Sequence, residues 1–217
     1  MNRRALCLLA GLLAGQALLA PPASAADDCR VDLGRGWPPA TENYGSTVEQ
    51  LFAGTARKPV LTLTRLPLRG VESGLQLFAG EDDADWWLRY STADERVSAW
   101  SGGRLELRTA RPPEQVEVPM PAALGRRVVT EWQRTLGALT PQDRAAEFFD
   151  DEVLLFVVDG LRVSGLQPGC GPGEELMQQL ELMIDATGDD EEDRAERWLK
   201  LGESLDQLEQ SLAGAAG

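Results

Sequence analysis

The sequence predicts a single α+β domain with an antiparallel β-meander of about five strands, a further buried β-hairpin, and helices packed on one face, including two C-terminal helices. Three observations support this fold class. Apolar and polar side chains alternate from residue 59 to about residue 117, as they do in half-buried strands. A continuous apolar run and a tight-turn signal follow at residues 153–163, and the chain ends in two segments of helical periodicity.

The first 25 residues have the order of a secretory signal peptide. Basic Arg3 and Arg4 precede an apolar stretch, and two prolines and the small residues 23–25 follow it. This order is typical of a Sec-type signal. The alternative is a membrane anchor, but the apolar stretch is short for a span and ends at prolines. We therefore expect cleavage before Ala26 and a bacterial protein that is periplasmic or secreted.

The rest of the chain suits one domain. Residues 26–43 are rich in Pro, Gly and Asp and predict an irregular leader. Residues 44–213 then form the α+β domain, and residues 214–217 a frayed C-terminus. A first helix is predicted at residues 46–54, because Ser46 can cap it, Glu49 completes a capping box and Gly54 ends it.

Five short strands are predicted between residues 59 and 117. Their sequences are VLTLTRL (60–66), GLQLFAG (74–80), DWWLRYS (85–91), RVSAWS (96–101) and RLELRTA (104–110). Each connection between them contains Gly, Asp or Pro, which favour tight turns. Short strands joined by short turns predict neighbours in one antiparallel sheet, with its polar face wet or covered by a helix.

A period change after the strands predicts a helix. It begins at Pro121, a residue that suits the first helical position, and apolar side chains recur at helical spacing over residues 128–139. A further short helix is predicted next, capped by Thr140 with Pro141 at its first position. Residues 153–158 then predict a strand buried on both faces, and Asp159-Gly160 predicts a two-residue hairpin turn at the centre of the core.

The final helix carries apolar residues at alternating spacings of three and four. We call this set the seam: Trp198, Leu201, Leu205, Leu208 and Leu212. Heptad spacing of this kind is typical of helix pairing. The seam either packs on the core of its own chain or joins two protomers, and the second alternative makes it a candidate interaction surface.

The composition excludes several classes of function. The chain has no histidine, which removes Ser-His-Asp and Cys-His catalysis and histidine-ligated metal sites. The formal charge is −14, and loss of Arg3 and Arg4 with the signal makes it −16. Such a surface repels nucleic-acid phosphates and anionic lipids. We therefore expect no cofactor, no nucleic-acid partner and no membrane insertion after signal cleavage.

One acidic cluster suggests an enzyme. Glu81, Asp83 and Asp85 precede Trp86 and Trp87 in a predicted hairpin loop, and carboxylates beside aromatic rings are typical of glycosidase sites. A carboxylate-dependent hydrolase of envelope glycans is therefore the alternative function. The structural interpretation is a polar turn before a strand, because adjacent tryptophans on a strand point to opposite faces.

A second acidic run, residues 189–193, precedes the last helix. Five carboxylates would suit Ca²⁺, but the run lacks the alternating spacing of an EF-hand loop. Acidic residues at the start of a helix also stabilise its unpaired amide groups. We therefore predict that the run caps the helix, with Ca²⁺ binding as the alternative.

Two cysteines remain after signal cleavage, Cys29 and Cys170, the second within QPGCGPG (167–173). An even number in an exported chain predicts a disulfide, which would tie the leader to the domain. A reactive thiol at Cys170 is the alternative, but no histidine or nearby lysine is present to lower its pKa.

The absence of a nucleophile motif and the acidic surface favour a non-catalytic protein that works by binding. We expect another envelope protein as its partner, or a second copy in a homo-oligomer.

Overall fold

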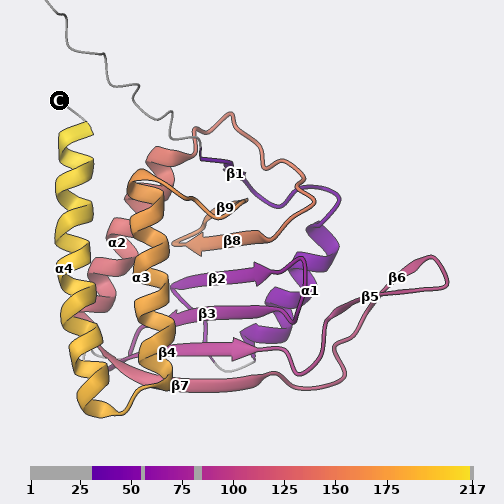
Figure 1. Ribbon diagram of the computed structural model, residues 1–217, viewed down its shortest axis with the longest axis horizontal. Coiled ribbons are helices and arrows are strands. Elements are labelled where there is room, and N and C mark those ends of the chain that lie inside the picture. Colours follow the sequence, from indigo (N-terminus) through magenta and orange to yellow (C-terminus); the bar gives the residue numbers. More distant parts are fainter. Residues whose placement is uncertain (1–30, 55–56, 81–84, 216–217) are drawn as a thin grey trace, which may run out of the picture.

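A computed structural model of the protein describes residues 31–54, 57–80 and 85–215 (Figure 1). A seven-stranded antiparallel sheet forms the centre of the fold, in the order β1-β9-β8-β2-β3-β4-β7. Its strands are β1 Leu33–Arg35, β2 Leu61–Leu66, β3 Ser73–Phe78, β4 Asp85–Thr92, β7 Glu114–Pro121, β8 Val153–Val158 and β9 Leu161–Gly165. The predicted α+β class is confirmed.

The helices lie on both sides of this sheet. Helices α2 (Ala122–Leu139), α3 (Gly171–Gly188) and α4 (Glu191–Ala215) group on one side, and α1 (Glu42–Ala53) lies on the other (Figure 1). Both C-terminal helices were predicted, whereas the position of α1 differs from the expected one-sided arrangement. Within the described ranges, no helix combines the length and the hydropathy needed to cross a bilayer.

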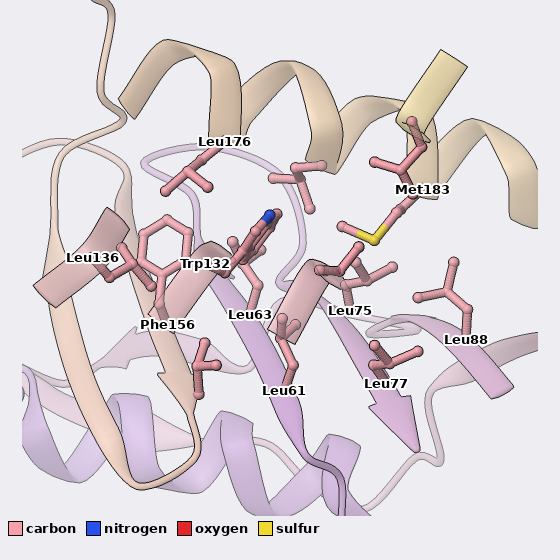
Figure 2. Packing of buried hydrophobic residues seen from close by; sticks show 14 of the residues in the cluster. Leu61, Leu63, Leu75, Leu77, Leu88, Trp132, Leu136, Phe156, Leu176 and Met183 are labelled. Atoms are coloured by element: carbon pink, nitrogen blue, oxygen red, sulfur yellow. The ribbon is translucent and has the colours of Figure 1, made fainter. Parts of the chain in front are cut away.

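The core lies between the sheet and helices α2 to α4. Alternate residues of β2 and β3, such as Leu63 and Leu75, point into it. Figure 2 shows Trp132 of α2 among these side chains. The Trp132 ring meets Phe156 edge-on, with 6.0 Å between centroids, and its Nε1 donates to Gln179 Oε1 at 2.8 Å. The indole is thus buried with its polar atom paired.

The meander is shorter than predicted. Strands β2, β3 and β4 are sheet neighbours, but β5 (Ser98–Ser101) and β6 (Arg104–Leu107) pair only with each other. The prediction that residues 96–110 continue the sheet is wrong. The outer neighbour of β4 is β7, with Thr92 opposite Glu114, since buried Val118 and Met120 of β7 join the core.

The predicted hairpin at the centre of the core is confirmed. Strands β8 and β9 lie between β1 and β2. The turn residues Asp159 and Gly160 have φ values of 46° and 82°, the left-handed conformation that a two-residue hairpin turn requires.

The N-terminal segment is more regular than predicted. Strand β1 lies within the expected irregular leader, and α1 begins at Glu42, so Ser46 lies inside the helix and does not cap it. The capping box is also wrong, because Glu49 accepts hydrogen bonds from Trp37 and Arg162. Tertiary packing extends the helix: a Cβ on Gly45 would lie 2.4 Å from the Trp37 ring.

The helix predicted after Thr140 is absent from the described chain, where residues 141–152 are irregular. Thr140 ends α2 instead: its backbone N–H donates to Leu136 O, and its own carbonyl accepts two hydrogen bonds from Arg35. The following segment pairs with the edge of β1, where the Arg35 N–H donates to Arg144 O at 2.8 Å. These contacts replace those of a second helix.

Candidate functional site

A β-hairpin projects from one end of the molecule (Figure 1). It consists of β5 and β6, and we call residues 94–111, which contain it and its two connections to the sheet, the arm. Its turn is formed by Gly102 and Gly103, with φ values of 55° and 78°. Glycine adopts these positive φ values without strain, so the sequence permits the tight reversal.

One face of the arm is apolar. Trp100 lies directly opposite Leu105, and Ser98 opposite Leu107. Because directly opposed residues share a face and alternate residues repeat it, Trp100, Leu105 and Leu107 lie on one face. Trp100 is 76% exposed and Leu105 is 41% exposed. A large aromatic side chain so exposed is unusual in a folded domain.

Further apolar side chains surround the base of the arm. Exposed Leu68 and Val71 belong to the turn between β2 and β3. This turn contacts the arm, because the Arg96 side chain donates to the carbonyls of Pro67 and Leu68. Four of the seven exposed large apolar side chains of the described chain therefore lie at this end, and such a concentration is typical of an interaction site.

A buried carboxylate fixes the base of the arm. Glu72 is fully buried and accepts hydrogen bonds from the backbone N–H groups of Val97 (2.8 Å) and Ser98 (3.3 Å). It also accepts one from the hydroxyl of Tyr44 in α1. Burial and the hydrogen bond to Glu72 raise the pKa of Tyr44 above its ordinary value, so the phenol remains a donor. Three donors compensate the carboxylate for its lost hydration.

Additional contacts join the two sides of the arm. The Arg108 N–H donates to Val97 O at 2.8 Å, and Arg111 pairs with Asp94 at 2.7 Å. The ion pair is exposed and therefore contributes little to stability. A two-stranded hairpin alone is only marginally stable in water. We conclude that the buried contacts at Glu72 hold the base in place while the tip remains uncovered.

The seam, by contrast, is filled by the protein itself. Leu201, Leu205 and Leu208 are fully buried, and Trp198 and Leu212 are partly buried against the same core. Helix α4 contacts α2 and α3. The first of the two alternatives for the seam, packing on its own chain, is the one found in the structure.

The acidic cluster beside the tryptophans offers no site geometry. Glu81 and Asp83 lie outside the described residues, as does the side chain of Asp85 at the start of β4. Trp86 is buried against Gly125 of α2, while the half-buried Trp87 follows it on the opposite face of the strand. The opposite orientations were predicted, and the hydrolase hypothesis stays a prediction.

The acidic run before α4 has the predicted capping role. Asp190 Oδ1 accepts from the backbone N–H groups of Glu192 (3.0 Å) and Asp193 (3.1 Å), and Asp189 binds Arg197 Nε at 2.9 Å. Asp190 therefore accepts hydrogen bonds from otherwise unpaired N–H groups at the start of the helix, and Asp189 binds an arginine of the same helix. Among the described residues, no group of three or more acidic or cysteine side chains is placed to hold a metal ion, so the structure does not support the calcium alternative.

Cys170 precedes α3 and is half-buried, whereas Cys29 lies outside the described residues. The predicted disulfide therefore stays a prediction. One contact is consistent with it: the Leu166 N–H donates to Asp32 O at 3.0 Å. Asp32 is near Cys29 in sequence, and Leu166 is near Cys170 in sequence.

No known protein-family model, curated protein sequence or solved structure matches this chain. The sequence pattern predicted both strands of the arm but placed them in the main sheet, whereas they form a separate two-stranded sheet. The sequence did contain a signal of a separate hairpin. Gly102 and Gly103 are adjacent, and they separate two short strands that each have one apolar face.

Proposed function

We propose that this protein is a non-catalytic binding protein of the bacterial envelope or its exterior, and that its arm inserts Trp100 and Leu105 into an apolar groove of a partner protein. The observation that carries the proposal is the exposed Trp100–Leu105 pair on a hairpin whose base is fixed by buried Glu72.

The chemistry of the tip suits protein recognition. Tryptophan and arginine are enriched among the residues that dominate binding energy, and Arg104 follows the turn directly. In the part of the chain that the structure describes, no ion pair engages Arg104. Arg104 pairs with Ser101 and lies on the face of the hairpin opposite Trp100 and Leu105, so a groove that takes up the apolar pair meets Arg104 only with a carboxylate at its rim.

The anchored base lowers the cost of binding. An ordered hairpin loses less conformational entropy on association than a flexible loop does. The hydrogen bonds of Glu72 order the arm before a partner arrives, so the binding energy of the apolar pair is not consumed in folding the hairpin.

A protein fits this surface better than a lipid bilayer does. The chain has a formal charge of −14, and anionic membrane surfaces repel such a body. An apolar groove of a partner protein carries no comparable negative surface charge, so it does not repel this chain.

Affinity capture from native envelope with the mature protein tests the proposal. The double variant Trp100→Ser, Leu105→Ser removes the apolar pair, and Leu199→Ser is the matched control, because Leu199 is 71% exposed on α4 away from the arm. We expect the wild type and Leu199→Ser to retain the same protein equally, and the double variant to lose at least about tenfold of it.

Equal capture by all three proteins would refute the role of the arm. Light scattering of the same proteins separates a second copy from a different partner. If the wild type is a dimer and the double variant a monomer, the arm binds its own chain and the hetero-partner version is wrong.

A further inference from the structure

Strand β7 is the last strand of the sheet, and its outer side is open (Figure 1). The opposite edge is closed by the chain itself, because Arg35 of β1 makes backbone hydrogen bonds with Arg144 and Ala146. Among the described residues, no backbone hydrogen bond reaches the outer side of β7. Residues 114–117 are all exposed. We call residues 114–118 the edge segment.

Prolines show which backbone groups of β7 face outward. Pro119 and Pro121 have no N–H, so they occupy positions that are not hydrogen-bonded to β4. Hydrogen-bonded and non-hydrogen-bonded positions alternate along an antiparallel pair. Gln115 and Glu117 therefore direct their N–H and C=O groups away from β4, toward solvent. An open strand edge of this kind is a template for pairing with a further strand.

The edge segment is complementary to itself. Pro113 and Pro119 lie at equal distances in sequence on either side of Val116. When a second copy pairs antiparallel with Val116 opposite Val116, Gln115 of each copy lies opposite Glu117 of the other, and the two residues exchange backbone hydrogen bonds. Pro113 then lies opposite Pro119, so no N–H is left unpaired. A register centred on Gln115 or Glu117 instead places the other of these two residues opposite a proline, and its carbonyl loses its donor.

The side chains favour the same register. Glu117 lies opposite the uncharged Gln115 and not opposite a second carboxylate, and like charges directly opposite each other are destabilising. The charge of Glu117 is balanced within its own chain by Arg57 at 2.6 Å and Arg89 at 2.8 Å. On the other face of the strand, Val116 is 48% exposed. Contact between the Val116 side chains of two copies removes this apolar surface from water.

We infer that two copies of this chain form a dimer through the edge segment, in antiparallel register about a twofold axis at Val116. The dimer joins the two sheets edge to edge, with helices α2 to α4 of both copies on the same face. Pairing at this segment does not depend on the function proposed for the arm.

The symmetry of the contact limits assembly to two copies. Each copy uses its β7 edge in an isologous contact, and its β1 edge is already paired, so neither edge of the described main sheet is left for a third copy. The prolines restrict pairing to a few residues, and the negative charge of each copy, formally −14, opposes association. We therefore expect a weak, reversible dimer with a dissociation constant of about 10–100 µM.

Sedimentation velocity of the mature protein over about 1–500 µM, in about 0.15 M salt, tests this inference. Val116→Glu and Val116→Lys each place like charges opposite each other across the axis, and each should weaken the dimer at least about tenfold. An equimolar mixture of the two variants should dimerise at least as tightly as the wild type, because the facing charges then differ in sign. Phe148→Glu is the matched control and should dimerise as the wild type does, since Phe148 is 60% exposed and follows the residues that pair with β1.

A proline variant tests the backbone contact separately. Gln115→Pro removes an outward N–H but no backbone hydrogen bond to β4. Its melting temperature at low protein concentration should match that of the wild type, whereas its dimer should be weakened at least about tenfold. The double variant Trp100→Ser, Leu105→Ser should dimerise as the wild type does, which separates the edge segment from the arm.

Four outcomes would overturn the inference. They are a monomer at every concentration, a Val116→Glu dimer as tight as that of the wild type, no dimer in the mixture of the two Val116 variants, and loss of the dimer in the double variant of the arm. If the Val116 variants do not fold, Gln115→Pro decides alone, and an unchanged dissociation constant in this variant would refute pairing through the edge segment.

Discussion

The seam of α4 and the apolar face of the arm differ in what covers them. Both are regular apolar patterns in sequence, the first at helical spacing and the second at strand spacing. In the structure, Leu201 and Leu205 of the seam are fully buried, whereas Trp100 of the arm is 76% exposed. The periodicity of a sequence thus reveals which face is apolar, while tertiary packing decides whether the same chain covers that face.

The two regions also differ in what holds them in place. The seam is held by apolar burial against α2 and α3, which stabilises in proportion to buried area. The arm is held at its base by hydrogen bonds to Glu72. The body can therefore lose stability without a change in the binding tip, and the tip can change without loss of stability.

Truncation in the seam should have the largest effect on stability. Leu205→Ala removes a fully buried side chain and should lower the free energy of unfolding by about 2–5 kcal/mol. Urea denaturation measures this loss. On the same helix, Leu199→Ala is the control and should change stability by less than about 0.5 kcal/mol. Similar losses in both variants would contradict the assignment of the seam to the core.

The anchor of the arm should have the next largest effect. Glu72→Gln replaces an acceptor of three hydrogen bonds with a neutral amide, and should cost about 2–3 kcal/mol of unfolding free energy. The amides of Val97 and Ser98 should also exchange with deuterium faster, while the core strands stay protected. Glu106→Gln, an exposed change on the arm, should alter neither quantity. Unchanged exchange in Glu72→Gln would show that other contacts order the arm.

A smaller, pH-dependent effect is expected at Tyr44. Burial and Glu72 raise the pKa of its phenol in the folded protein, whereas the unfolded chain has the ordinary value of about 10. The contribution of Tyr44 to the free energy of unfolding is fully present below the pKa of the unfolded chain. It is lost as pH rises above that pKa, by at most about 1.4 kcal/mol per pH unit.

Comparison with Tyr44→Phe isolates this contribution. The stability difference between wild type and variant should be constant from neutral pH to about 9 and should shrink above about 10. A difference that stays constant across the alkaline range would mean that the folded phenol ionises as readily as the unfolded one.

The smallest effect on stability is expected at the tip of the arm. Trp100→Ser should change the free energy of unfolding by less than about 0.5 kcal/mol, since the side chain contacts little of its own chain. Thermal denaturation provides the measurement. A loss above about 2 kcal/mol would place Trp100 among the structural residues and remove the main support for a binding tip.

Local patterns predicted much of this fold. The α+β class, strands β2 to β4, the Asp159-Gly160 hairpin and the two C-terminal helices are all specified by periodicity and turn chemistry over short windows. The failures depend on contacts distant in sequence. Helix α1 starts earlier than predicted because Gly45 meets Trp37, and no helix follows Thr140 because the next segment pairs with β1.

The candidate sites were harder to predict than the fold. The strands of the arm were found, but their departure from the sheet depends on Glu72, which lies 25 residues from Val97 in the chain. The cavity between α1 and the sheet was not predicted, since it forms only when α1 covers that face of β2 and β3. Its one signal in the sequence is the polar alternation of β2 and β3, which is equally typical of a solvent-facing strand.

The affinity of the captured partner protein for the arm tests the central claim most directly. Interferometry with the purified partner should give a dissociation constant at least about 100-fold weaker for Trp100→Ser, Leu105→Ser than for the wild type, consistent with the loss of two dominant contacts. The constant for Leu199→Ser should match that of the wild type. Equal affinities for the wild type and the double variant would contradict the account.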